Sequence, residues 1–200
     1  MGELRRDADL RAALLRSAAE VAARSGVGAV SIRALARAVG VSHAAHRHHF
    51  SSRVGLLTAL AAEGHRLLAR ALEEAAGTDF REVGVAYVRF ARDHPGHFVV
   101  MFTPDVLDPA DGELSAARAR TFAVLQGGVD ALSSAGRVDD ARTAVVAAWS
   151  LVHGFAGLAA TGNLAGAGLA PDTGEDALLD LARRATGMLY GSPGGGAGRA

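Results

Sequence analysis

The stretch from residue 31 to residue 50, SIRALARAVGVSHAAHRHHF, constrains the fold most, because it reads as two short helices joined at a glycine. Good helix formers follow Ser31, whose hydroxyl is placed to cap a helix that ends near Ala38. Gly40 then offers a residue that adopts a positive φ without steric cost. Ser42 is a second possible N-cap, and another short helix follows it.

Two short helices around a glycine-containing turn form a helix-turn-helix, which lays its second helix in the DNA major groove. Leu35, Ala36, Val39 and Val41 are spaced to close the angle between the two helices. Any corner between two helices needs similar residues, so a purely structural corner stays open on this pattern alone. The stretch predicts a DNA-reading head.

The rest of the chain repeats apolar residues at helical spacing and shows no alternating strand pattern of any length. We therefore expect an all-α fold of about nine helices. The segments expected to be helical outside the first stretch are about 10–24, 52–75, 80–93, 95–102, 111–134, 139–161 and 175–190. We expect three parts, namely a head (1–51), a helical body (52–191) that begins with a connecting helix (52–76), and a disordered glycine-rich tail (192–200).

The charge distribution supports a head that meets phosphate. Residues 1–70 hold 11 Arg against 5 acidic residues, whereas residues 71–200 hold 10 Arg against 16. The chain has no cysteine, which excludes disulfides, thiolate catalysis and cysteine-bound zinc. No unbroken apolar run approaches the ~20 residues of a membrane span, and the N-terminus lacks a secretory apolar core. A cytoplasmic location without membrane contact is expected.

The run GVSHAAHRHHFSSRVGLLTAL (40–60) resembles the DNA-binding domain of the TetR family of bacterial repressors. In that family a short recognition helix ends in an aromatic-His-Phe turn, and a serine and a basic residue open a long helix; residues 49–53, HFSSR, match this ending. Two positions depart from the pattern, since His46 stands where the family has an apolar residue or proline, and Arg47 where it has a phosphate-touching tyrosine.

A second resemblance lies in the body. The segments WSLVHG (149–154) and HPGHFVVMF (94–102) resemble the C-terminal regulatory domain of a TetR subfamily named for a Trp–His–Gly signature. Together, the two resemblances imply a homodimer with two heads on a palindromic operator of double-stranded DNA. They also imply a ligand cavity in the body that controls the spacing of the heads.

The predicted DNA contacts lie on both helices of the head and at the start of the connecting helix. Arg47 is the best candidate to read a phosphate or a guanine, because its planar fork donates two hydrogen bonds at once. The whole set is Ser31, Arg33, Ser42, His43, Ala44, Arg47, His48 and Arg53. The histidines between 43 and 49 lack a carboxylate within the helix as a third zinc ligand, so neither a metal nor a cofactor is expected. The resemblance implies that His49 is a packing residue.

Aromatic and soft side chains gather in the body. Plain core packing explains any one of them, but as a set they could line an apolar cavity with a few polar points, as small-molecule sites do. The predicted ligand-binding residues are Phe90, His94, His97, Phe98, Met101, Phe122, Trp149 and His153. The expected effector is a small and largely apolar molecule.

Two other classes of function compete with a regulator. An enzyme is disfavoured, because the chain has no G-x-S-x-G elbow, P-loop, H-E-x-x-H or strand-borne glycine fingerprint. A helix-turn-helix protein without ligand control would not need so large a body. The predicted function is therefore a dimeric repressor that binds a palindromic operator and is released by a small molecule. The last two helices are predicted to form the dimer interface, because they hold more apolar and small residues than one neighbour can bury.

Overall fold

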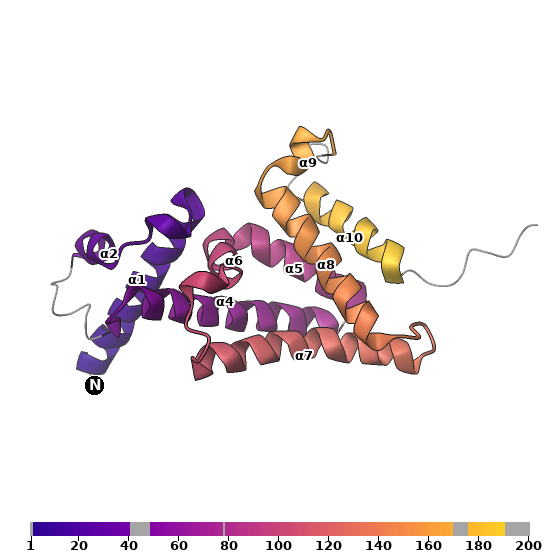
Figure 1. Ribbon diagram of the computed structural model, residues 1–200, viewed down its shortest axis with the longest axis horizontal. Helices are drawn as coiled ribbons and strands as arrows, with labels where there is room; N and C mark the ends of the chain where they lie inside the picture. The colour runs from indigo at the N-terminus through magenta and orange to yellow at the C-terminus, as the bar shows by residue number, and fades with distance from the viewer. Residues whose placement is uncertain (1, 41–48, 78, 170–175, 191–200) are drawn as a thin grey trace, which may run out of the picture. The chain divides into compact units, whose positions relative to one another are not determined.

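The computed structural model describes residues 2–40, 49–77, 79–169 and 176–190 of the 200-residue chain, with side chains described from residue 9 to residue 188 of these ranges. Within them the chain forms nine α-helices, two 3-10 helices and no strand, which confirms the all-α prediction. In chain order, with the labels of Figure 1, these are α1 (Gly2–Ser25), η1 (Val27–Ala29), α2 (Ile32–Val39), α4 (Arg53–Ala76), α5 (Phe80–Asp93), α6 (Pro95–Met101), η2 (Pro104–Val106), α7 (Gly112–Ser134), α8 (Ala141–Ala160), α9 (Asn163–Gly166) and α10 (Ala177–Tyr190).

Two predicted boundaries were wrong. Helix α1 begins at Gly2 rather than at Leu10. Most residues of this earlier stretch, namely Glu3, Leu4, Arg5 and Arg6, are good helix formers, which favours the earlier start. The connection between α8 and α10, for which no helix was predicted, contains the short helix α9.

The chain divides into two compact units that do not follow the expected boundary after residue 51. The first unit consists of residues 1–69 and 93–122, and the second of residues 70–92 and 123–200. Helices α4 and α7 therefore contribute residues to both units, and the predicted division into head and body stays a prediction. Each unit is described by itself below.

The core of the first unit is the first half of α4. Its residues Leu57, Leu60 and Ala61 are completely buried. Helix α1 contacts both α2 and α6, and Leu14 is among the buried residues that it contributes. Gly96, at the start of α6, is buried so closely against the backbone carbonyl of Ala19 that an added Cβ would overlap it. The close approach of α1 and α6 therefore requires glycine at this position.

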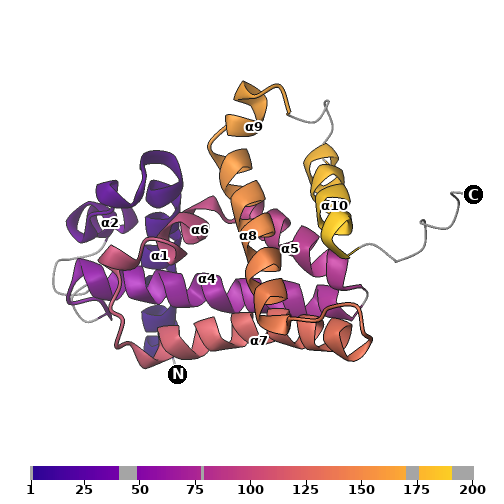
Figure 2. The same ribbon diagram turned by 45° about the vertical axis from the view of Figure 1, so that its right-hand side comes forward.

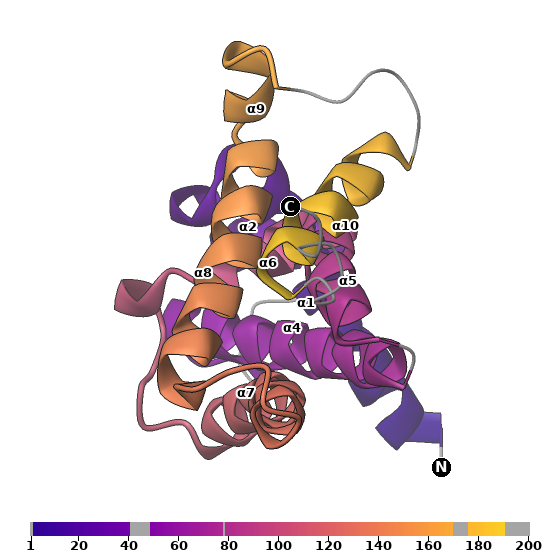
Figure 3. The same ribbon diagram turned by 90° about the vertical axis from the view of Figure 1, so that its right-hand side faces the viewer.

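In the second unit, α10 packs onto α5. Val85 and Val88 of α5 form a buried cluster with Leu179 and Ala182 of α10, and Phe155 of α8 packs against it. Helices α8 and α10 lie side by side (Figure 2), and α9 lies at the C-terminal end of α8 (Figure 3). This arrangement leaves much of the outer surface of α8 exposed.

Two neighbouring glycines in α7 are expected to respond oppositely to alanine. A Cβ on Gly127 would meet nothing within 4 Å, whereas a Cβ on Gly128 would overlap the ring of Phe80. We expect Gly127→Ala to raise the free energy of unfolding by about 0.5–1 kcal/mol, because alanine is the better helix former. Gly128→Ala should lower it by about 1–2 kcal/mol through overpacking. Urea denaturation of both variants checks this, and equal effects would contradict the packing at Phe80.

Candidate functional site

The first helix of the predicted helix-turn-helix forms as expected and ends at Gly40. This glycine has φ 76° and ψ 28°, in the left-handed region, and its N–H donates to the carbonyls of Ala36 and Arg37. Leu35 and Ala36 are buried. The predicted cap at Ser31 was wrong, since its side chain makes no capping hydrogen bond. Ser31 is exposed, so water can satisfy the first N–H groups of α2.

The predicted DNA contacts divide between described and undescribed parts of the chain. Ser31 and Arg33 are exposed at the start of α2, where a phosphate could reach them. The positions Ser42, His43, Ala44, Arg47 and His48, together with His46, lie outside the described residues. Contact of all these residues with DNA stays a prediction.

Arg53, the first residue of α4, holds the turn that precedes α2. Its Nε donates to the carbonyl of Val30 at 2.9 Å, and its Nη2 donates to the carbonyl of Val27 at 2.6 Å. Nearby, the Arg11 guanidinium carbon lies 5.5 Å from the centre of the Phe50 ring, a cation–π distance. Arg53 was predicted only as a DNA contact, and nothing in the sequence indicated this second role, in which it positions α2 against α4.

In the second unit, Tyr87 of α5 and Trp149 and His153 of α8 form a polar cluster. Trp149 and His153 belong to the predicted ligand-binding set. The hydroxyl of Tyr87 lies 2.9 Å from Nδ1 of His153, and the rings of Trp149 and His153 have centroids 6.2 Å apart. Burial raises the pKa of Tyr87 and lowers the pKa of His153. The two groups are therefore a neutral pair near pH 7. Phe90, also predicted, is buried in α5 of the same unit.

In the first unit, α6 carries most of the other predicted ligand residues. The His94 and His97 rings are perpendicular, with centroids 5.8 Å apart. The Nε2 atom of His97 lies 4.0 Å from Oε2 of Glu63. The pKa of Glu63 is lowered, chiefly by the neighbouring His97 ring and then, against a cost of burial, by the positive charges of Arg66 and Arg11. Glu63 is therefore a carboxylate at neutral pH.

The remaining members of the predicted set differ in burial. Phe98 and Met101 are buried, whereas Phe122 is 43% exposed. Five of the eight predicted residues belong to the first unit and three to the second. A single cavity lined by all of them stays a prediction.

Two family comparisons cover most of the chain. Residues 14–60 match the profile of the bacterial regulatory proteins of the tetR family. Residues 80–191 match the profile of the tetracyclin repressor-like C-terminal domain. The chain belongs to the TetR family. It is therefore a DNA-binding transcriptional regulator with a C-terminal ligand-binding domain, from a family of regulators rather than enzymes in which ligand response and dimeric DNA binding are typical.

Solved structures of similar chains share this fold. A protein of unknown function from Rhodococcus sp. RHA1 is 32% identical, with a TM-score of 0.73 over 90% of this chain and 93% of that one. The TetR-family regulator PfmR from Thermus thermophilus is 24% identical, with a TM-score of 0.68 over 88% and 96% of the two chains. A tetR-family regulatory protein from Rhodococcus RHA1 is 22% identical, with a TM-score of 0.68 over 90% and 94%. Among curated proteins, none matches this chain.

Helix α8 of this TetR-family chain is long and apolar enough to span a membrane by length and mean hydropathy alone. It contains no unbroken apolar run of that length, because its few polar residues are scattered among alanines and glycines. Only 17% of this apolar stretch is buried. A helix of a soluble protein that packs against a partner chain has the same composition, and we propose such a role for α8 below.

The sequence analysis also missed His65. This histidine of α4 is 6% exposed, and its Nδ1 lies 3.3 Å from Oγ1 of Thr121 in α7. Burial and then the positive charge of Arg118 lower its pKa to about 4. The signal was present, since His65 follows Ala61 by four positions and precedes Leu68 by three, on the apolar face of the helix. Among the described side chains, no group of three or more His, Asp or Glu residues could hold a metal ion.

His65 should make the stability of the chain fall at acid pH. The unfolded state binds a proton near pH 6.5, and the folded state only near pH 4. Stability from this group is therefore present above pH 6.5 and is lost as the pH falls toward 4. We expect the parent to lose on the order of 2–3 kcal/mol more than His65→Gln between pH 7 and pH 4.5. Urea denaturation at both pH values measures this, and equal losses would mean that His65 is solvated.

Proposed function

We propose that this chain is a ligand-responsive repressor that binds a palindromic operator as a homodimer and is released by a small, largely apolar molecule. The observation that carries the proposal is the helix that ends at Gly40, with Arg53 holding the preceding turn against α4. This geometry suits a helix-turn-helix that is displaced as one piece when α4 moves. A cytoplasmic location and the absence of enzymatic activity are part of the proposal.

The proposed dimer interface is formed by α8 and α10. Val146 of α8 is 57% exposed and Met188 of α10 is 88% exposed, which is a large apolar surface for a soluble chain. On α8, a Cβ at Gly154 or Gly157 would meet nothing within 4 Å, so a second helix can approach there. An obligate interface of this kind buries ~2,000 Å² or more in total.

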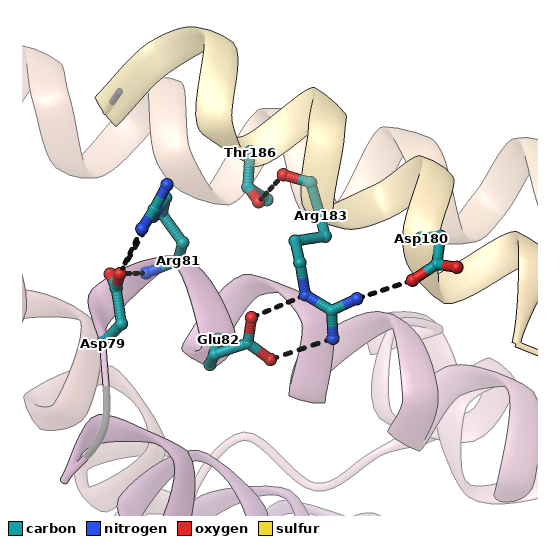
Figure 4. A network of polar contacts seen from close by, with 6 residues as sticks. All are labelled: Asp79, Arg81, Glu82, Asp180, Arg183 and Thr186. Atoms are coloured by element: carbon teal, nitrogen blue, oxygen red, sulfur yellow. Dashed lines mark hydrogen bonds and ion pairs between the residues drawn. The ribbon is translucent and has the colours of Figure 1, made fainter. Parts of the chain in front are cut away.

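A charged network fixes α10 in place for this contact (Figure 4). The Nε and Nη2 atoms of Arg183 donate to the two carboxylate oxygens of Glu82 in α5, at 2.7 and 3.2 Å. Its Nη1 donates to Asp180 at 2.7 Å. The pair is bidentate but largely exposed, so it serves orientation more than stability.

The proposed effector contacts are Tyr87, Trp149 and His153, which lie within or beside the proposed interface helix α8. Trp149, His153 and Gly154 also support membership in the Trp–His–Gly subfamily, by resemblance of their order and spacing. A ligand that displaces the Tyr87 hydrogen bond would shift α8, and a coupling of ~1–3 kcal/mol to DNA binding suffices for regulation.

Sequencing the genomic fragments that the purified protein retains tests this function and yields the operator. A gel shift with that operator and candidate molecules then separates the classes of protein. Release of the DNA by a small molecule supports the proposal. Tight binding without release by any molecule would favour a helix-turn-helix protein without ligand control, and no retained DNA would contradict the proposal.

Arg47 is predicted to contribute a full charge to the operator contact. If it meets a phosphate, Arg47→Ala should weaken binding to all sequences about equally and lower the salt slope by ~1. If it reads a guanine, the loss should be ~1–3 kcal/mol and confined to one base position. Binding isotherms at three salt concentrations distinguish these results. Arg89→Ala, which removes an exposed arginine of α5, is the control. An equal effect of both variants would mean that Arg47 contributes only to the overall positive charge and makes no specific contact with the operator.

A further inference from the structure

A polar atom without a partner lies beside aromatic rings in the first unit. His65 of α4 is almost fully buried, and its ring meets the Phe102 ring edge-on, with centroids 6.2 Å apart and an interplanar angle of 66°. Phe102 in turn packs against Phe98, with centroids 5.1 Å apart. Among the described residues, Nε2 of His65 has no hydrogen-bond partner.

The neighbours of His65 determine which of its nitrogens carries the proton. The hydroxyl of Thr121 lies 3.1 Å from the carbonyl of Ala117 and 3.1 Å from the carbonyl of His65 itself. Carbonyls only accept, so the single hydrogen of this hydroxyl is directed to them, as is common for threonine in a helix. The Thr121 oxygen must then accept from Nδ1 of His65 at 3.3 Å. Nε2 is left with a lone pair and no hydrogen.

The chemistry of this atom selects the kind of group that could meet it. A buried acceptor without a partner is costly and requires a donor. The ring stays neutral near pH 7, because burial and then the charge of Arg118 oppose its protonation. The same positive field opposes an ammonium group. An uncharged hydroxyl is the donor that suits an acceptor in a positive field among phenylalanine rings.

We propose that Nε2 of His65 is the hydrogen-bond acceptor of a binding site for an uncharged hydroxyl compound with an apolar body that packs beside Phe102. Binding is a property of the protein without DNA and goes beyond the function proposed above. Only the further step, in which such a compound also releases the operator, rests on that proposed function.

Three probes of nearly equal shape test the site, namely benzyl alcohol, ethylbenzene and benzylamine, which is charged at neutral pH. Calorimetry or ligand-observed NMR on the full chain measures their affinities at pH 7. We expect the alcohol to bind about tenfold more tightly than ethylbenzene, as one recovered hydrogen bond implies, and the ammonium compound to bind most weakly. His65→Leu should abolish or reverse the preference for the alcohol over ethylbenzene.

Two further variants separate the acceptor from a merely structural role. His65→Gln keeps an amide oxygen and should retain part of the preference for the alcohol. Thr121→Val removes the acceptor of the Nδ1 hydrogen, so it should reduce the preference while His65 remains. Nitrogen NMR of the parent should show Nε2 without a proton at pH 7, which is a readout that needs neither a probe nor a Leu variant that folds.

Several results would overturn the proposal. Equal affinity of the parent for the alcohol and ethylbenzene, no measurable binding of any probe, or a protonated Nε2 at pH 7 would each do so. An unchanged preference in His65→Leu would also remove His65 from the site. None of these measurements involves DNA, so failure to bind an operator would leave the site intact and contradict only the regulatory function.

Discussion

Replacing Gly96 by alanine is expected to lower the free energy of unfolding by about 3 kcal/mol, because the new methyl group has no room between α1 and α6. The three nearest atoms that it would meet all belong to the backbone of Ala19, so no side-chain rotation can relieve this overlap. For a chain of this size the melting temperature should fall by roughly 6–12 °C. Thermal and urea denaturation measure the loss.

Gly64 provides a matched control for Gly96 in the same unit. A Cβ on Gly64 would lie 2.5 Å from Sδ of Met101, which is the flexible part of a methionine side chain. Gly64→Ala should therefore cost only ~1 kcal/mol. If Gly96→Ala is as stable as the parent, or if Gly64→Ala is the more damaging change, the close contact between α1 and α6 is wrong.

Introducing a charge on the outer face of α8, as in Val146→Arg, is expected to convert the proposed dimer into monomers. In a two-fold interface each substitution occurs twice, so two like charges would be buried without partners. Operator affinity should fall at least ~100-fold, because two half-sites would no longer be bound by one particle. Light scattering at micromolar concentration and a gel shift measure the two effects.

The control for this prediction carries the same charge elsewhere. Ala131 is exposed on α7 of the same unit, and Ala131→Arg should leave both dimer and operator binding intact. A parent protein that is strictly monomeric at micromolar concentration would contradict the proposed interface, and so would a Val146→Arg variant that remains dimeric.

The helices were predictable because their causes are local. Apolar spacing located α5, α7 and α8 to within about two residues, and Gly40 adopts the positive φ that a glycine after α2 predicts. The start of α1 was not predicted, because charged residues read as a solvated terminus although they also form helix well. Periodicity finds the middle of a helix more reliably than its ends.

Features that depend on distant parts of the chain could not be read from the sequence. Gly96 follows a proline and looks like a simple break between helices, yet its purpose is contact with Ala19 of another helix. The arginine fork at Arg53 looked like a phosphate contact, because nothing local shows the carbonyls of Val27 and Val30. The candidate DNA contacts followed from a short motif, whereas the acceptor at His65 required its three-dimensional neighbours.

The two hydrogen bonds that Arg53 donates also bear on how such proteins diversify. Because one guanidinium joins position 53 to the carbonyls at 27 and 30, the two ends of the intervening segment are held together. Backbone carbonyls are the same for every amino acid, so the closure does not depend on which side chains lie between. New operator preferences can therefore arise by exchange of that segment alone, while its attachment to the remainder of the protein is inherited unchanged.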